Sequence, residues 1–237
     1  MTRAPGAGGP AFLFDLDGTL LDSVYQHVVA WHEVLLEVGI EVPAWSLHRR
    51  IGMSGGLFLA ALAHETGRTI DAADVGMLSA MHAAAFERQR ASVRPLPGAP
   101  ELLAALSAIG VPWAIATSGL EAGARPALEL LGVPGAVLVT RDQVRRAKPD
   151  PDLFLAAARA LGEEPAHCLV VGDSVWDLLA ARRAGSLGLG VLTGGYGQDE
   201  LERAGAYRVY EDPADLLDRL YEVGVRRASD AGGSATR

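Results

Sequence analysis

Cysteine and lysine are almost missing from this chain of 237 residues. The single cysteine, Cys168, excludes an intrachain disulfide, which is typical of a protein from a reducing compartment. Its place in the apolar run HCLVV predicts a small, buried hydrophobic side chain. Of the 21 Lys and Arg residues, all except Lys148 are arginine, so Lys148 is either a chance survivor on the surface or a position that requires lysine.

An excess of positive charge and long apolar segments are also lacking. The formal net charge is −8, which argues against a nucleic-acid partner, because phosphate backbones are bound by clustered Lys and Arg. No apolar run approaches the length that spans a membrane, and the start, MTRAPGAGGP, lacks the apolar core of a signal peptide. We therefore expect a soluble, cytoplasmic protein without a membrane partner.

Short apolar runs alternate with helix-like stretches over most of the chain. The apolar runs are 11–15, 111–117, 136–140, 167–173 and 187–193. The helix-like stretches after residue 95 are 98–109, 121–131, 151–161, 175–184, 198–204 and 213–223. Wholly apolar strands separated by helices are typical of a parallel sheet covered on both faces. We therefore predict an α/β fold, in which ligands bind at the carboxyl ends of the strands.

The segment from 23 to 94 has a different pattern and shows no strand-like alternation. One face of a helix is marked there by Val24, Val28, Trp31, Leu35 and Val38. Alanine-rich, helix-like stretches follow at 55–66 and 72–90. We predict a helical domain at 23–94, inserted into a core of residues 11–22 and 95–225. Residues 1–10 and 226–237, rich in small residues, are predicted to be flexible tails.

Polar residues follow four of the predicted strands and would meet at one edge of the sheet. Taken one by one, such residues are often helix N-caps, an interpretation that fits Ser174 well and Thr117 fairly. Capping does not explain Asp15 and Asp17, which would lie about 6–7 Å apart on one side of an extended segment. Their charges would repel by roughly 2–3 kcal/mol at an effective dielectric of about 20. A partly hydrated Mg²⁺ with oxygen ligands would relieve this repulsion.

Four segments carry a resemblance to a known family. FDLDGTLLDS, TSG, KPDPDLF and GDSVWD, in this order and at these strand ends, resemble the four motifs of the haloacid dehalogenase superfamily. The closer similarity is to its phosphoglycolate-phosphatase and β-phosphoglucomutase-like branch. The resemblance implies a Rossmann-like parallel-sheet core with an inserted α-helical cap domain. It also implies a phosphoric monoester hydrolase that uses Mg²⁺ and an aspartyl-phosphate intermediate.

The resemblance assigns the acidic residues to the reaction and to the metal. Asp15 would be the nucleophile that attacks phosphorus. Asp17 would protonate the leaving oxygen and later deprotonate water, so it must carry a proton near neutral pH, which crowded carboxylates can arrange. Mg²⁺ would bind the carboxylates of Asp15 and Asp173 and the backbone carbonyl of Asp17. Asp177 would position the groups that surround these ligands.

Three further residues would bind the phosphate by the same resemblance. Thr117 and the Ser118 backbone would hold phosphate oxygens, and Lys148 would contact both Asp15 and the phosphate. An ammonium is a compact point charge, whereas a guanidinium is a broad planar fork. A site between a carboxylate and a phosphoryl oxygen would therefore accept lysine and exclude arginine.

The cap would select the substrate. His27 matches a histidine of the mutases and of many sugar-phosphate phosphatases, although it could also be merely packed. The segment RRIGMSGG (49–56) resembles the substrate-specificity loop, in which Arg49 or Arg50 could meet a second anionic group or lie on the surface, and Ser54 is a further substrate-binding candidate. Gly55 stands where the mutases carry an arginine, which favours a phosphatase.

Three functions remain compatible with the sequence. The first is a Mg²⁺-dependent phosphatase of a small phosphorylated metabolite, such as phosphoglycolate or a sugar phosphate. The second is a sugar-phosphate mutase, and the third is a phospho-ligand binding protein without catalysis. The four intact motif residues Asp15, Asp17, Lys148 and Asp173 argue against the third. We expect a monomer or a homodimer.

Overall fold

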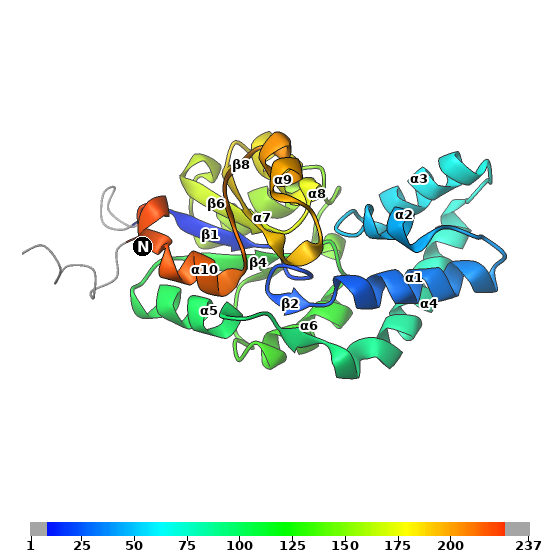
Figure 1. Ribbon diagram of the computed structural model, residues 1–237, viewed down its shortest axis with the longest axis horizontal. Helices are drawn as coiled ribbons and strands as arrows, with labels where there is room; N and C mark the ends of the chain where they lie inside the picture. The colour runs from blue at the N-terminus through cyan, green and yellow to red at the C-terminus, as the bar shows by residue number, and fades with distance from the viewer. Residues whose placement is uncertain (1–8, 226–237) are drawn as a thin grey trace, which may run out of the picture.

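A six-stranded parallel sheet forms the centre of the protein, which we describe from a computed structural model for residues 9–225 (Figure 1). The predicted tails lie outside these residues, except for residues 9 and 10. The strand order is β5-β4-β1-β6-β7-β8, and every neighbouring pair is parallel. The strands are β1 (Ala11–Phe14), β4 (Trp113–Ala116), β5 (Leu138–Val139), β6 (Cys168–Gly172), β7 (Leu187–Val191) and β8 (Ala206–Tyr210).

The five predicted strands are confirmed, whereas β8 was not predicted. β8 lies at the edge of the sheet, and only Tyr210 among its five residues is buried. An edge strand of this kind lacks the continuous apolar run by which the buried strands are identified. Cys168, at the start of β6, is buried as predicted, and burial is the main cause that raises the pKa of its thiol to about 11, with Glu163 and Glu164 adding to the effect.

Helices cover both faces of the sheet, because successive residues of a strand point to opposite sides. Phe12 and Phe14 pack in one hydrophobic cluster with α5 (Ala99–Ala108), α6 (Glu121–Leu130) and α10 (Pro213–Asp218). Ala11 and Leu13 pack on the other face with α7 (Asp152–Leu161) and α8 (Val175–Ala184). Helix α9 (Gln198–Ala204) packs beside α8, and a short 3₁₀ turn, Leu220–Val223, follows α10. These helices match the predicted stretches.

A second group of helices lies between two short strands, β2 (Leu21–Asp22) and β3 (Arg94–Pro95), which pair antiparallel. The helices are α1 (Val24–Glu37), α2 (Ala44–His48), α3 (Gly55–Thr66) and α4 (Ala72–Gln89), followed by a 3₁₀ turn, Arg90–Ser92. They surround a hydrophobic cluster of their own and extend to one side of the sheet (Figure 1). We call this group the cap. Helix α2 was not predicted, because five residues are too few for a helical period to be recognised.

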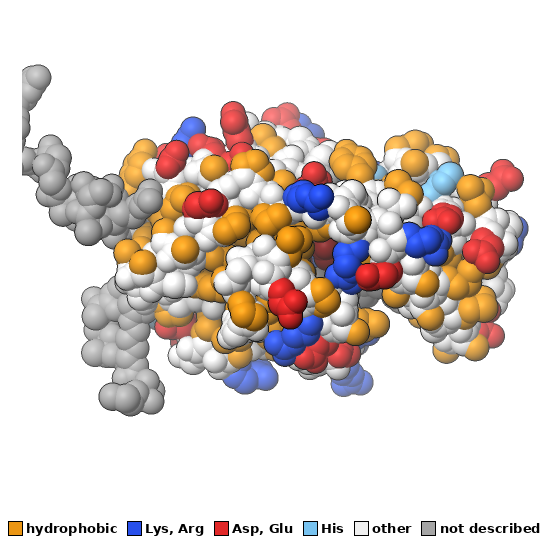
Figure 2. Space-filling view, turned by 90° about the horizontal axis from the view of Figure 1, so that it is seen from below, with side chains coloured by type: hydrophobic (Ala, Val, Ile, Leu, Met, Phe, Trp, Pro, Cys, Tyr) orange, Lys and Arg blue, Asp and Glu red, His pale blue; other side chains and the backbone are white. Residues whose placement is uncertain are grey.

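The order of the strands fixes where a ligand can bind. After β1 the chain runs outward through β4 to β5, then returns to the other side of β1 as β6. The crevice at the carboxyl end of β1 is therefore the point at which the strand order reverses, the usual ligand site of such sheets. Among the described helices, none is long and apolar enough to cross a membrane. On the face seen in Figure 2, acidic and basic side chains are interspersed.

Candidate active site

Three buried carboxylates meet at the carboxyl ends of β1 and β6. Asp15 follows β1 directly, Asp173 follows β6, and Asp177 lies in the first turn of α8. Each contributes one carboxylate oxygen to a group whose members all lie within 4.8 Å of one another. The chain thus brings together three of the predicted site residues from segments more than 150 positions apart.

Lys148 is the counter-charge inside this cluster. Its side chain is 0% exposed, its Nζ forms an ion pair with Asp15, and the same Nζ lies 2.8 Å from Asp177 Oδ1. Burial by itself would lower the pKa of Lys148, but the charges of Asp15 and Asp177 raise it above its usual range, so the ammonium stays charged. The interpretation of Lys148 as an exposed chance survivor is therefore wrong.

The cluster holds more negative than positive charge when it is fully ionised. Burial raises the pKa of Asp15 to about 7, against the opposing effect of Lys148 and with a smaller contribution from Asp177. Burial also raises the pKa of Asp173 well above its usual range, and Asp177 and Asp15 add to this effect. Three carboxylates facing one ammonium leave two negative charges unbalanced, which a divalent cation with oxygen ligands would neutralise. The residues fit a Mg²⁺ ion.

Glycines give the backbone close access to the carboxylates. A Cβ atom on Gly194, in the turn after β7, would lie 1.8 Å from Asp173 Oδ2. A Cβ on Gly18 would lie 2.5 Å from the same oxygen, and Gly18 also has a positive φ of 86°. Asp173 Oδ1 accepts a hydrogen bond from Thr19 Oγ1 at 2.9 Å. Neither Gly194 nor Thr19 was predicted from the sequence as a neighbour of this site.

The Asp17 side chain is not a member of the group of three carboxylates and has other partners. Its Oδ1 accepts a hydrogen bond from Ser23 Oγ at 2.7 Å and lies 3.3 Å from His27 Nε2. Burial acts to raise the pKa of Asp17. The opposing effects of His27 and the Ser23 hydroxyl are together larger, so the pKa lies below its usual range. The pKa of Asp15, raised mainly by burial, therefore lies above its usual range, whereas the pKa of Asp17 lies below it, contrary to the sequence-based expectation.

The structure also tests the capping interpretation of two strand-end residues. Ser174 is the N-cap of α8, as predicted, and both its backbone N–H and its hydroxyl donate to Asp177 Oδ2. Thr117 is not an N-cap, since Leu120 occupies that position before α6. Thr117 is buried at the end of β4, where its Oγ1 accepts from the Gly119 N–H at 3.0 Å.

Several predicted residues join the cap to this edge of the core. The Ser118 hydroxyl donates to the carbonyl of Gly52, in the cap loop 49–54, at 2.9 Å. Ser54 is buried, and its N–H donates to the carbonyl of Lys148 at 3.3 Å. The guanidinium of Arg49 pairs with Glu200 and stacks over the Tyr196 ring. These contacts place the predicted specificity loop against the core.

Arg50 lies elsewhere. Its guanidinium donates to the Ser46 carbonyl at 2.6 Å and pairs with Glu65 at 2.5 Å, both within the cap. The structure therefore does not bring Arg50 together with the carboxylate cluster. The partner of Arg50 comes from the next cap helix, α3, so no sequence pattern identified it.

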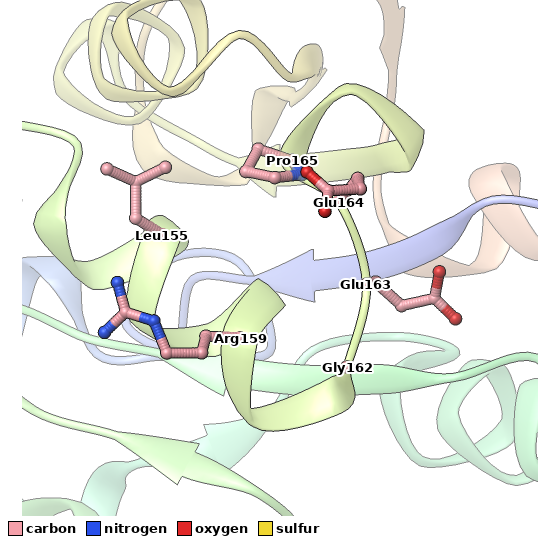
Figure 3. A pocket seen from close by; sticks show the side chains of 6 residues that line it. All are labelled: Leu155, Arg159, Gly162, Glu163, Glu164 and Pro165. Carbon is pink, nitrogen blue, oxygen red and sulfur yellow. The ribbon is translucent and has the colours of Figure 1, made fainter. Parts of the chain in front are cut away.

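A hollow of about 390 Å³ lies apart from the carboxylate cluster (Figure 3). Its lining comes from α7 and the turn that leads into β6, namely Leu155, Arg159, Gly162, Glu163, Glu164 and Pro165. That turn precedes β6, whereas Asp173 follows it. The hollow is thus at the amino end of β6, opposite the edge where the predicted site residues meet.

Comparison with known proteins gives consistent matches. Residues 10–185 match the model of the haloacid dehalogenase-like hydrolase family. The chain is 33% identical over 214 residues to the N-acetylmuramic acid 6-phosphate phosphatase of Pseudomonas aeruginosa, covering 89% of this chain and 94% of that protein. It is 34% identical over 220 residues to the phosphoglycolate phosphatase of Rhodospirillum rubrum, covering 89% and 90%.

A solved structure shows the same fold over nearly its full length. The crystal structure of a hydrolase from Pseudomonas syringae superposes with a TM-score of 0.88 at 52% sequence identity. The match covers 90% of this chain and 99% of that one.

Proposed function

Because the chain belongs to the haloacid dehalogenase-like hydrolase family and is a phosphoric monoester hydrolase, we propose that it hydrolyses a small sugar phosphate or phosphoglycolate through attack by Asp15. The observation that carries this proposal is the buried ion pair of Lys148 with Asp15 at the carboxyl end of β1. Phosphoryl transfer depends chiefly on positioning and charge neutralisation. The Lys148 ammonium holds the attacking carboxylate in one orientation and offers positive charge to a phosphoryl oxygen.

The carboxylate cluster supports a role for Mg²⁺. We assign the ion to the carboxylates of Asp15 and Asp173 and to the backbone carbonyl of Asp17. Asp177 has Lys148 and Ser174 as partners, so its role is to orient Lys148. When bound, the cation would neutralise charge on the transferring phosphoryl group.

Acid and base catalysis belongs to Asp17 in this proposal. In the free protein its pKa lies below the usual range, so the carboxyl is ionised near neutral pH. A phosphate monoester beside it adds negative charge, and a nearby like charge raises the pKa of a carboxyl group. The substrate itself would therefore favour the protonated form, which donates to the leaving oxygen. The ionised form then accepts a proton from the water that cleaves the aspartyl-phosphate.

The remaining predicted residues would bind the substrate. Thr117, the Ser118 backbone and Lys148 are assigned to the phosphate oxygens. In the cap, His27 and Ser54 are the better candidates for contact with the leaving group, since they lie beside Asp17 and Lys148 respectively. Arg50 would first have to leave Glu65. The named substrates of the relatives, N-acetylmuramic acid 6-phosphate and phosphoglycolate, support a small, polar phosphate ester.

A phosphate-release assay on a panel of phosphorylated metabolites tests the reaction. With Mg²⁺ present, we expect wild-type protein to release phosphate and Asp15→Asn to lose turnover by about 10³-fold or more. Asp22→Asn, at an exposed aspartate in β2, is the matched control and should retain activity. Substantial turnover by pure Asp15→Asn would refute nucleophilic attack by Asp15. Conversion of a hexose 1-phosphate to the 6-phosphate without free phosphate would instead identify a mutase.

Metal removal tests the assignment of Mg²⁺. Activity should be lost in EDTA, return with Mg²⁺ and be inhibited by Ca²⁺, which prefers more ligands at longer distances. Binding can be followed without turnover, because Mg²⁺ should raise the melting temperature of wild-type protein and have a smaller effect on Asp173→Asn. Full activity in a metal-stripped sample would contradict the assignment.

A further inference from the structure

Two histidines from different cap helices lie one behind the other beside Asp17. His27, on α1, places Nε2 at 3.3 Å from Asp17 Oδ1. Its other ring nitrogen, Nδ1, lies 3.2 Å from Nε2 of His82, on α4. His82, His27 and Asp17 thus form a chain of contacts that runs from α4 through α1 to the core. Asp17, at its end, is the residue to which the proposed function assigns proton transfer.

Aromatic packing holds both rings in place. The His27 ring is stacked on Phe86, with centroids 4.0 Å apart and an interplanar angle of 6°. The His82 ring is stacked on Trp31, with centroids 4.2 Å apart and an angle of 16°. Stacking fixes the plane of each ring, but it does not decide which edge of His27 faces Asp17. A half-turn about the Cβ–Cγ bond would keep the stack and would replace Nε2 by a carbon atom.

Hydrogen bonding decides that orientation. Asp17 Oδ1 already accepts a hydrogen bond from the Ser23 hydroxyl at 2.7 Å, so the His27 nitrogen that lies 3.3 Å from this oxygen, Nε2, is the donor and carries the proton. In a neutral ring Nδ1 is then an acceptor, and the group facing it must donate. That group is His82 Nε2. Burial, with a contribution from His27, lowers the pKa of His82 to about 3, so His82 is neutral and can carry its single proton on Nε2.

We propose that His82 is a positioning residue, which donates from Nε2 to His27 Nδ1 and thereby holds the Nε2–H of His27 on Asp17. This inference rests on the proposed role of Asp17. His82 itself does not touch the reacting groups. It acts by excluding the half-turned form of His27, and it makes the orientation of a core carboxylate depend on the packing of two cap helices.

The first test reads the proton positions directly and needs no substrate. Nitrogen-15 NMR of the full-length, metal-free protein at pH 8 distinguishes protonated from bare ring nitrogens. We expect both His27 and His82 to carry the proton on Nε2. In His82→Phe, which keeps a ring against Trp31 but has no donor, His27 should show a mixture of tautomers. A bare Nε2 on His82 in wild-type protein would overturn the proposal.

The second test is kinetic and uses the best substrate of the phosphate-release panel. His82→Phe should lower kcat on the order of 10-fold with a smaller change in KM, because geometry at the proton-transfer step is disturbed. His82→Gln, whose amide can donate, should recover part of the loss. His64→Phe, at an exposed histidine of α3, is the matched control and should behave as wild type.

Two kinetic results would also overturn the proposal. One is a wild-type kcat in His82→Phe, and the other is a His82→Gln variant as impaired as His82→Phe. Melting curves of all variants separate these results from a loss of folding. Activity retained by Asp15→Asn would refute the proposed function, whereas the tautomers of His27 and His82 would still be readable by NMR, so the two failures are distinguishable.

Discussion

At the scale of single residues, the need for lysine at position 148 is explained by space and charge together. The side chain is completely enclosed and its Nζ lies between Asp15 and Asp177. The centroid of the Phe154 ring lies 5.2 Å from the same nitrogen. A guanidinium is wider and needs its donors in one plane. It would have to displace one of these neighbours, so a swap that preserves charge is not conservative here.

We therefore expect Lys148→Arg to lose turnover almost as completely as Lys148→Ala. It should also melt at a lower temperature than wild type, because overpacking a buried site costs about 1–3 kcal/mol of stability. Arg145→Lys, at an exposed position in the same segment, is the matched control and should be neutral within about 0.5 kcal/mol. Phosphate release and thermal melting measure both effects. An active Lys148→Arg protein would show that the site accommodates a guanidinium.

Which single residues could be predicted depended on whether the strand order of the core already places them beside their partners. Asp15, Lys148 and Asp173 could be predicted, because each follows a strand whose carboxyl end meets the others. The lowered pKa of Asp17 could not, since its cause, His27, lies on a cap helix whose docking no local pattern reveals. The ion pair of Arg50 with Glu65, on α3, could not be predicted for the same reason.

At the scale of secondary-structure elements, apolar strands and long helices were predictable, whereas the edge strand β8 and the approach of one turn to the carboxylate cluster were not. Buried strands must be apolar on both faces, so β1 and β6 stand out in the sequence. The edge strand β8 has only one protected side and gives no such signal. The approach of the turn after β7 to the carboxylate cluster, at Gly194, matters more for function, and no sequence pattern indicated it.

Gly194→Ala should therefore damage the site although it adds one methyl group. A Cβ there would overlap Asp173 Oδ2 at 1.8 Å, so the carboxylate or the turn must move. We expect phosphatase activity to fall by about 10²-fold, as for a displacement near 1 Å, and Mg²⁺ to raise the melting temperature less than in wild type.

Gly76→Ala is the control, because nothing lies within 4 Å of its Cβ in the middle of α4. It should stabilise the protein by roughly 0.5–1 kcal/mol. Equal activities of the two variants would contradict this account.

At the scale of the whole molecule, the end of α2 and the loop 49–54 that follows it bring the cap into contact with the core. The carbonyl of Arg49 accepts hydrogen bonds from Trp176 Nε1 at 3.2 Å and Tyr196 Oη at 2.9 Å. His48 Nε2 lies 2.8 Å from the carbonyl of Gly194, in the turn beside the carboxylate cluster. The Arg49 side chain pairs with Glu200 on α9. The cap loop thus contacts the same segments that position Asp173 and Asp177, a relation between distant segments that the sequence alone did not reveal.

The Arg49–Glu200 ion pair offers a way to weaken this interface without touching the reacting groups. Glu200→Gln removes the charge but keeps an oxygen that can accept from the Gly197 N–H at the start of α9, so the helix should persist.

A partly exposed ion pair contributes roughly 0.2–1 kcal/mol. If the cap must rest on the core to bind substrate, kcat/KM should fall by about 1.4- to 5-fold at low salt. Because salt screens exposed charges, the difference from wild type should shrink as ionic strength rises. Glu202→Gln, at an exposed position two residues further along the same helix, is the control and should leave kcat/KM unchanged at every salt concentration. A Glu200→Gln protein indistinguishable from this control at low salt would mean that the ion pair does not hold the cap on the core during turnover.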